Sequence, residues 1–527
     1  MTSRTSCLQP LSLEEAAGLA PEQVAAMSAQ LAAAQQQIEW FKRQLFGQKS
    51  ERRVIDPHSA QLPLMQSPDQ PDVEVEVQAP QRSVGAHTRS APRAKSEAAE
   101  QGLPFFDASR VPIELIELAP AEIATLSEGD YEIIGHKDSY RLAQRPGSYV
   151  VLHYRRAVVK LHESAQILTA RAPVGVFEGS RADVSFVAGL LIDKMAYHLP
   201  LYRQHQRLAD AGISVSRAWL TQLTQQAASL LEPIYCAQFD SIRASRVKAM
   251  DETPIKAARA GPGKMKAAYF WPIYGELDEV CFPFFESRRH EHVEQALGFT
   301  KPQGAVLLSD GYAAYARYAA KSGITHAQCW AHCRRGFFEA QGVEPQAAAH
   351  ALELIGALYE VEAQIKADKL SAARKLDYRL MHAKPIVERF FAWVEAQLNA
   401  QGLLPSNPLT QALAYARERR FGLEVFLTDP EVPIDSNHLE RALRAIPMGR
   451  RNWLFSWTEL GAQHIGIVQS LIVTCRLHQI NPYDYLVDVL QRVAQHPAAR
   501  VAELTPRLWK QHFAEHPLRS PLHKLSD

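Results

Sequence analysis

The chain is poor in cysteine and has no long apolar run. No stretch of about 18 apolar residues occurs, so no transmembrane helix is expected. The first twenty residues lack the apolar core and positive flank of a secretory signal. The cysteines form no C-x-x-C pair, and their scatter favours a reducing cytoplasm over a disulfide framework. They are Cys7, Cys236, Cys281, Cys329, Cys333 and Cys475.

Charge of one sign is also lacking. The 58 basic residues nearly balance 57 acidic ones, which leaves a formal net charge of +1. Bulk charge therefore gives no argument for nucleic-acid binding, which has to rest on local clusters. The sequence has no Walker loop and no Gly-x-Ser-x-Gly elbow, so neither ATP-driven chemistry nor an α/β-hydrolase is indicated. The length of 527 residues predicts three or four domains.

The N-terminal region carries a heptad repeat. Apolar residues recur in steps of three and four after Pro21, which fits the first position of a helix. This spacing predicts a coiled-coil helix within residues 1–48, through which the chain self-associates as a homo-oligomer. An amphipathic helix packed against its own domain is the alternative. The seam consists of Val24, Met27, Leu31, Ala34, Ile38, Phe41 and Leu45.

Three further segments precede the main α/β region. Residues 49–103 are rich in Pro, Gln, Ser and charge, so they are predicted to be a flexible linker. Residues 104–180 contain alternating β-branched runs and predict a small β module. Residues 181–240 read as helix, glycine turn at Gly212 and helix, with Ser214 or Ser216 as the cap of the second helix. That outline fits a DNA-binding helix-turn-helix, and it equally fits an ordinary helical hairpin.

The character of the sequence changes after residue 246, where short strands are indicated. Residues 345–430 are then strongly helical, and residues 461–527 form a C-terminal helical region. The fold class predicted for the whole chain is α+β multidomain. Three strand-like runs, a helix and a continuously apolar strand follow one another at 247–253, 267–275, 279–286, 290–299 and 304–312.

Three acidic residues stand at positions suited to metal chemistry. Asp251 closes the first strand-like run, Asp310 closes the apolar run GAVLLSD, and Glu440 lies on a predicted helix capped by Asp435 or Ser436. Two carboxylates at the ends of adjacent strands and a third on a helix across them could hold two Mg²⁺ ions. Such a site activates water or a 3′-hydroxyl against a phosphodiester. A strand-end Asp is also a common turn former, so spacing alone is weak evidence.

A basic run follows the third acid. No acidic residue occurs from 441 to 451, and an amide and an aromatic residue come next. Cations beside a carboxylate site suit phosphate contacts, and an aromatic ring suits base stacking. A solvated basic helix face would give the same pattern. The candidate DNA-binding residues are Arg441, Arg444, Arg450, Arg451, Asn452 and Trp453.

Several blocks of the sequence, in order, closely resemble transposases of the insertion-sequence-66 (IS66) family, members of the DDE superfamily. The blocks around the three acids are MDETP, LSDGYAAY and IDSNHLER. Others are FGQKSER, DKMAYHLPLYRQ, CWAHCRRGF, GRRNWLF and NPYDYL. Their joint occurrence over nearly the whole chain makes the resemblance highly specific.

The resemblance implies a catalytic and metal-binding triad of Asp251, Asp310 and Glu440 that uses Mg²⁺, or Mn²⁺ in its place. It implies an RNase H-like core over residues 241–460 with a helical insertion at about 345–430. It also implies DNA partners, namely transposon ends and target, with small accessory proteins encoded alongside. The expected location is the cytoplasm, on the nucleoid when bound to DNA. Asn437, Cys329 and His332 are expected to support the site.

One departure from the family concerns zinc. The family usually carries a cysteine-rich module before the helical block, whereas no cysteine occurs here between Cys7 and Cys236. A structural zinc in the β module is therefore not expected. The spacing H-x-x-C-x-x-H-C could seat part of a zinc site, but core packing near the acids is the favoured interpretation. Its members are His326, Cys329, His332 and Cys333.

The function predicted from the sequence is that of a DNA transposase. It would cut phosphodiesters at transposon ends and transfer the 3′-hydroxyl ends to target DNA. A first alternative is a non-catalytic DNA-binding regulator or decayed transposase, against which the three intact acids argue. A second is a structural coiled-coil assembly protein, which would show no preference for any DNA sequence.

Overall fold

A computed structural model describes residues 105–524, apart from positions 110, 125, 128, 146, 163–165, 262, 300 and 401–403. The chain divides into the units 1–102 and 103–527, and every described residue belongs to the second. The heptad helix predicted in residues 1–48 and the linker predicted in 49–103 therefore lie outside the described residues. No described helix is long and apolar enough to cross a membrane.

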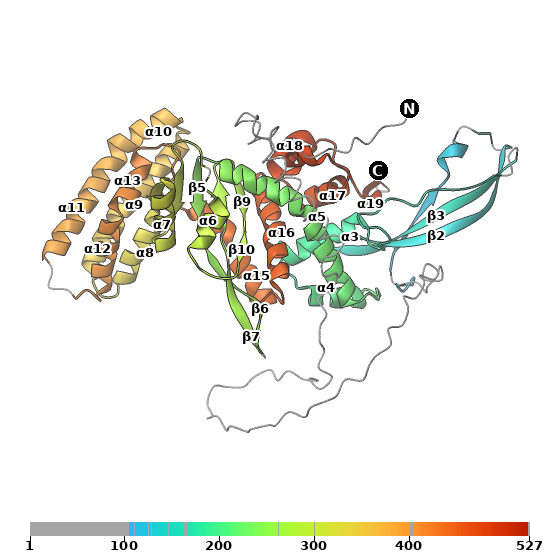
Figure 1. Ribbon diagram of the computed structural model, residues 1–527, viewed down its shortest axis with the longest axis horizontal. Coiled ribbons are helices and arrows are strands. Elements are labelled where there is room, and N and C mark those ends of the chain that lie inside the picture. The colour runs from blue at the N-terminus through green and yellow to red at the C-terminus, as the bar shows by residue number, and fades with distance from the viewer. Residues whose placement is uncertain are drawn as a thin grey trace, which may run out of the picture. The chain divides into compact units, whose positions relative to one another are not determined.

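The first described region is a four-stranded sheet. A long antiparallel hairpin pairs β2 with β3, β1 runs parallel to β3, and β4 is antiparallel to β3. The run SYVVLHYRRAVVKL, whose alternation predicts a strand, is the whole of β3. Figure 1 shows the hairpin in cyan. The bounds are β1 Ile113–Leu118, β2 Tyr131–Arg145, β3 Ser148–Leu161 and β4 Ile167–Thr169.

Three helices follow, α3 (Val184–Met195), α4 (Leu201–Asp210) and α5 (Arg217–Ala244). Gly212 ends the α4 turn with φ 87°, a conformation that favours glycine. Ser216 caps α5, and its side chain accepts a hydrogen bond from the Trp219 amide. The predicted order of helix, glycine turn and serine-capped helix is confirmed.

The central five-stranded sheet has the order β12-β11-β5-β8-β9. β5, β8 and β9 are antiparallel neighbours, whereas β11 runs parallel to β5 and β12 parallel to β11. All four residues of β11 are buried, as its continuously apolar run predicts. All four residues of β5 are also buried, including Lys248, whose ammonium group donates to the Arg243 carbonyl. The bounds are β5 Val247–Met250, β8 Ile273–Gly275, β9 Glu279–Cys281, β11 Val306–Ser309 and β12 Thr325–Gln328, with helices α6 Glu291–Leu297 and α7 Ala313–Ser322.

The strand-like runs at 267–275 and 279–286 are each divided between two sheets, which corrects the prediction of one strand apiece. The divisions fall at Pro272 and Pro283, because proline has no amide hydrogen for a ladder. The carbonyls of these prolines still accept hydrogen bonds from Asp251 and Trp271. A second sheet of order β10-β7-β6 results, with bounds β6 Thr253–Gly261, β7 Lys264–Phe270 and β10 Phe284–Phe285.

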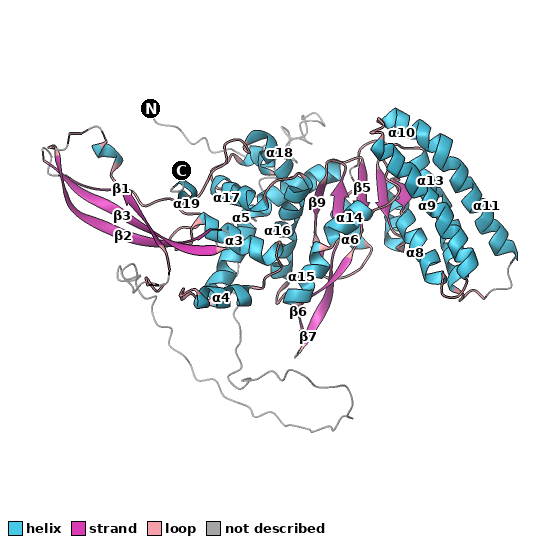
Figure 2. Cartoon of the chain, turned by 180° about the vertical axis from the view of Figure 1, so that it is seen from behind, coloured by secondary structure: helices cyan, strands magenta, loops and turns pink. Residues whose placement is uncertain are grey.

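The predicted helical region 345–430 is confirmed as a bundle beside β12. Its interior is aromatic: the ring of Trp330 lies 5.2 Å from that of Phe390, edge to face, and Phe337 packs on the same ring. Figures 1 and 2 show these helices together at one end of the described unit. They are α8 Trp330–Ala340, α9 Pro345–Ala367, α10 Ala372–Tyr378, α11 Lys384–Ala400, α12 Pro408–Glu418 and α13 Arg420–Glu424.

The C-terminal helices pack against α5 and the central sheet. Ser470 and Thr474 of α16 accept hydrogen bonds from the backbone of Phe282 and Val280 at β9. These buried side-chain contacts fix α16 against the sheet opposite the bundle. The helices are α14 Asn437–Leu443, α15 Ala445–Trp453, α16 Glu459–Leu477, α17 Pro482–Arg492, α18 Pro506–His512 and α19 Pro521–Lys524.

Candidate active site

Asp251 and Asp310 follow the carboxyl ends of two neighbouring parallel strands. The β5–β11 register pairs Val247 with Val306 and Ala249 with Leu308, a constant offset of 59 residues. Continued two residues further, the same offset sets Asp251 opposite Asp310. Neighbouring strands lie about 4.8 Å apart, so the two carboxylates leave the same edge of the sheet side by side. The structure thus brings together the first two acids predicted from the sequence.

Contacts with the end of β12 and with α8 position Glu440 near this edge of the sheet. Cys329 follows β12, and its amide donates to the Ser309 carbonyl beside Asp310. The Cys329 sulfur in turn accepts hydrogen bonds from the amide and hydroxyl of Ser436, the residue before α14. Glu440 stands one turn into α14, where its Oε1 lies 3.8 Å from Nε2 of His332 on α8. Cys329 and His332 therefore contact the segment that carries the third acid.

The charge balance at Asp251 is unfavourable without a cation. Burial raises the pKa of Asp251 to about 7, and the nearby carboxylates of Glu252 and Asp310 contribute to the rise. The Glu252 amide, which donates to Asp251 Oδ1 at 2.8 Å, opposes the shift, as does His332. A divalent cation would relieve the repulsion between carboxylates that are crowded into a partly buried site in this way.

Asp310 is held by its own turn and by the helical insertion. Its Oδ1 accepts a hydrogen bond from the Tyr312 amide at 2.9 Å, and the preceding Ser309 hydroxyl bonds to His326 at 2.8 Å. Arg419, at the end of α12, donates to the Gly311 carbonyl at 3.2 Å. A β-carbon at Gly311 would lie 2.7 Å from the Arg419 Nε, so a larger residue there would displace this arginine.

Glu252 is a fourth acid that the sequence analysis did not single out. It accepts hydrogen bonds from Arg288, at 2.7 Å, and from the Tyr315 hydroxyl, at 2.6 Å. These partners occupy its two oxygens and turn it toward α7. The sequence offered one signal for Glu252, which is its position next to Asp251. Its hydrogen-bond partners lie 36 and 63 residues away, so no local pattern reveals them.

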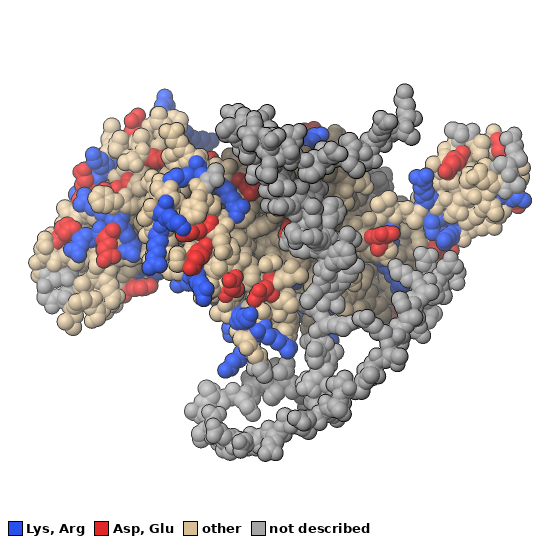
Figure 3. Space-filling model, viewed as in Figure 1, with Lys and Arg blue, Asp and Glu red and all other residues tan. Residues whose placement is uncertain are grey.

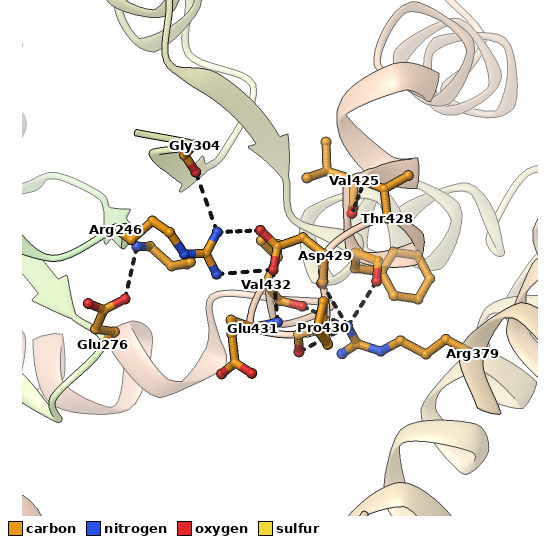
Figure 4. A network of polar contacts seen from close by, with 12 residues as sticks. Arg246, Glu276, Gly304, Arg379, Val425, Thr428, Asp429, Pro430, Glu431 and Val432 are labelled. Carbon is orange, nitrogen blue, oxygen red and sulfur yellow. Dashed lines mark hydrogen bonds and ion pairs between the residues drawn. The ribbon is translucent and has the colours of Figure 1, made fainter. Parts of the chain in front are cut away.

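The loop before α14 is held from two sides (Figure 4). Arg246, just before β5, pairs with Asp429, and Arg379 of the insertion donates to the carbonyls of Phe426 and Val432 at 2.9 and 3.0 Å. Arg379 is fully buried. The core and the insertion therefore both fix the segment that leads to Glu440.

The fit of a metal can be tested on the side chains themselves. No group of three His, Cys, Asp or Glu residues among the described residues is already arranged around one point. However, Glu440 Oε1 is buried and has no hydrogen-bond partner in the described part of the chain, and the same holds for His332 Nδ1. The three acids offer only oxygen atoms as ligands, and such a donor set suits Mg²⁺ or Mn²⁺.

The four residues of the H-x-x-C-x-x-H-C spacing have different partners. His326 bonds to Ser309, Cys329 to Ser436, and His332 faces Glu440. Cys333 is buried in the core, and burial raises the pKa of its thiol well above the usual value. Because the four side chains have different partners, their arrangement favours core packing and the positioning of neighbouring residues over the binding of one zinc ion.

The predicted DNA-binding residues lie on α14, on α15 and at the junction between them, where Arg444 stands. Arg441, Arg444, Arg451 and Asn452 are exposed, whereas Arg450 is half-buried and donates to the Pro254 carbonyl. Trp453 packs against the core at Gly449, where a β-carbon would lie 2.6 Å from its ring nitrogen. The exposed tryptophan of this segment is Trp457, at 44%, which the sequence analysis did not select. Asn437 begins α14 and donates to Asp435.

We expect the Asp251→Asn substitution to stabilise the metal-free protein above neutral pH. The folded state keeps a proton on Asp251 up to about pH 7 that the unfolded chain releases near pH 4, so stability falls as pH rises through this window. The upper limit of this loss is about 4 kcal/mol. Thermal unfolding in EDTA from pH 5 to 8 should therefore show a smaller decline for the variant than for the wild type. Mg²⁺ should raise the Tm of the wild type and leave that of the variant unchanged. Curves of Tm against pH that run parallel for the two proteins would refute the expectation.

Comparison with known proteins adds independent evidence. Residues 179–464 match the family described as Transposase IS66 family, and residues 470–507 match the IS66 C-terminal element. Residues 33–104, which all lie outside the described residues, match Transposase C of IS166 homeodomain.

Three similar proteins of Sinorhizobium fredii carry names that state no function. Uncharacterized protein y4hP is 29% identical over 507 residues, 90% of this chain and 88% of the relative. Uncharacterized protein y4qI is 30% identical over 73% of each chain. Uncharacterized protein y4jD is 26% identical over 93% of this chain and 97% of the relative.

Proposed function

Because the chain belongs to the IS66 family of DDE transposases, we propose that it cuts DNA at transposon ends and joins the 3′-hydroxyl ends to target DNA. Membership implies a polynucleotidyl transferase with an RNase H-like core. The observation that best supports the proposal is the register of β5 and β11, which sets Asp251 opposite Asp310. Glu440, with its unpaired Oε1, faces the same edge through His332.

In this proposal Asp251, Asp310 and Glu440 hold the divalent ions. When bound, Mg²⁺ or Mn²⁺ supplies Lewis-acid activation of the attacking oxygen and charge neutralisation at the leaving oxygen. The chain itself orients the acids: the Tyr312 amide holds Asp310, and the Glu252 amide holds Asp251. His332 lies where it can stabilise the Glu440 carboxylate.

We assign phosphate binding to the exposed guanidinium groups that follow Glu440. Arg441, Arg444 and Arg451 are exposed on α14 and α15, and Arg450 and Asn452 stand beside them. Such contacts position the duplex and make binding strongly dependent on salt. Recognition of the transposon ends is assigned to the β module and to the exposed start of α5 at Ser216, Arg217 and Ala218. The N-terminal heptad would pair protomers so that both ends are held together.

A nicking assay tests the proposal. The full-length protein is incubated with supercoiled DNA carrying the sequences that flank its gene, with Mg²⁺, Mn²⁺ or EDTA. The proposal expects metal-dependent nicks at the element boundary that leave 3′-hydroxyl ends. Tight binding to the same ends without any nick in either metal would instead identify a non-catalytic regulator.

A further inference from the structure

The β6–β7 hairpin is a strongly basic element that begins two residues after Asp251. It contains four cationic side chains and no acidic residue from 253 to 270. All four are exposed. Figure 3 shows blue side chains at the lower edge of the view, where the hairpin projects in Figure 1. Two lie on β6 and two on β7: Lys256, Arg259, Lys264 and Lys266.

The hairpin is joined to the basic segment that follows Glu440. Ser456 bridges to Ala257 on the free edge of β6, and the Ala258 amide donates to the Ser456 carbonyl. Arg450 donates to the Pro254 carbonyl at the start of β6. The cations of the hairpin and the arginines of α15 thus belong to one continuous structure beside the acids.

An exposed aromatic ring completes this surface. The Arg259 guanidinium lies 4.9 Å from the centre of the Trp457 ring, and Phe455 packs edge-on against the same ring at 4.8 Å. A cation beside an aromatic face is the combination with which proteins grip nucleic acid strands. Lys266 pairs with Glu459 at 3.5 Å, and the hairpin itself contains no acidic residue that would neutralise its other cations.

A simpler explanation would be that the lysines protect a sheet edge from aggregation. β10 pairs only with Tyr269 and Phe270, so β7 has β6 as its one strand partner at Lys264 and Lys266. Lys264 and Lys266 stand on β7, two residues apart and therefore on one face. Edge protection therefore covers these two lysines, but it does not explain why Arg259 lies against the Trp457 ring, whereas a nucleic acid strand lying across the hairpin contacts the cations and the ring together.

We propose that the β6–β7 hairpin is a DNA-binding arm that holds the phosphates flanking the scissile bond. This inference rests on the proposed function and adds a binding surface to it. The seven residues of β7 extend over about 23 Å at roughly 3.3 Å each. Phosphates of one strand repeat about every 3.4 Å along the helix axis, so the arm is as long as roughly seven of them.

The test replaces Lys256, Arg259, Lys264 and Lys266 with glutamine in the full-length protein. The matched control replaces four exposed cations of the helical bundle, which changes net charge equally: Lys366, Lys369, Arg374 and Arg389. Binding to end-containing DNA is measured by fluorescence anisotropy in Ca²⁺ over a series of salt concentrations. Each phosphate that a cation neutralises adds about 0.9 to the slope of log K against log salt. The slope should therefore fall by about 3.6 for the hairpin variant and stay unchanged for the control.

A second variant, Lys264→Gln with Lys266→Gln, leaves the Arg259–Trp457 pair intact and should lower the slope by about 2. If both folded hairpin variants show the wild-type slope of log K against log salt, the hairpin is not a DNA-binding arm, and the proposed function is unaffected. A wild-type protein that binds no DNA would overturn both. An equal fall in the slope for the hairpin variant and the control would show that only the net charge of the protein matters, and it would overturn the proposal.

Discussion

Replacing Asp310 with asparagine is expected to lower the rate of strand cleavage on the order of 10⁴-fold while leaving affinity for the ends intact. The side chain follows β11 and stands opposite Asp251 in the strand register. The amide removes one negative charge and one metal-binding oxygen without changing the volume of the side chain. Its remaining oxygen can still accept the hydrogen bond from the Tyr312 amide, so the turn should persist.

Single-turnover cleavage of end-containing DNA in Mg²⁺ measures this effect, with anisotropy for binding. The matched control is Glu339→Gln, an exposed acid on α8 that should cleave at the wild-type rate. Asp251→Asn and Glu440→Gln should lose activity to a similar degree, because acids that act as one unit are not additive. Cleavage by Asp310→Asn within tenfold of the wild type would remove this residue from the site.

The second large effect concerns stability. Arg379→Leu is expected to destabilise the protein by about 3–5 kcal/mol, because it leaves one partner of a buried ion pair uncompensated. Arg379 is fully buried and holds Glu362 through two bonds, at 2.7 and 2.8 Å. The substitution also frees the carbonyls of Phe426 and Val432 in the loop that leads to Glu440. Cleavage should therefore fall together with stability.

Thermal and urea unfolding measure the first consequence, and Arg374→Leu on α10 is the control because that arginine is exposed. Arg379→Lys should recover only part of the stability, since an ammonium group cannot reproduce the planar fork. A Tm for Arg379→Leu equal to that of the control would show that the buried network in Figure 4 contributes nothing.

The sequence predicted the strands that carry the acids because their signals are local. The run ending in Ser309 and Asp310 is apolar and short, which is typical of a buried strand, and β11 is buried throughout. The helix bearing Glu440 begins at Asn437, next to the predicted cap residues Asp435 and Ser436. Here Ser436 is the cap position, while Asp435 Oδ1 accepts the hydrogen bond from the Asn437 amide.

Features that depend on distant partners could not be predicted. Arg419 contacts Gly311 across 108 residues, and no local pattern in the sequence links the two. The β6–β7 hairpin was missed because residues 253–261 were not recognised as a strand, and the prolines that divide the runs were read as interior positions. Trp453 and Trp457 look equivalent in a basic segment, and only packing against Gly449 distinguishes the half-buried ring from the exposed one.

Metal-specific rescue of Asp310→Cys tests the direct ligation of a divalent ion most sharply. A thiolate binds Mg²⁺ poorly and binds softer ions such as Mn²⁺ better. The full-length variant, incubated with DNA carrying the ends of its element, should therefore be inactive in Mg²⁺ and recover cleavage at the same phosphodiester in Mn²⁺. Equal activity in the two metals, or cleavage that persists in EDTA, would contradict a metal site built on Asp251, Asp310 and Glu440.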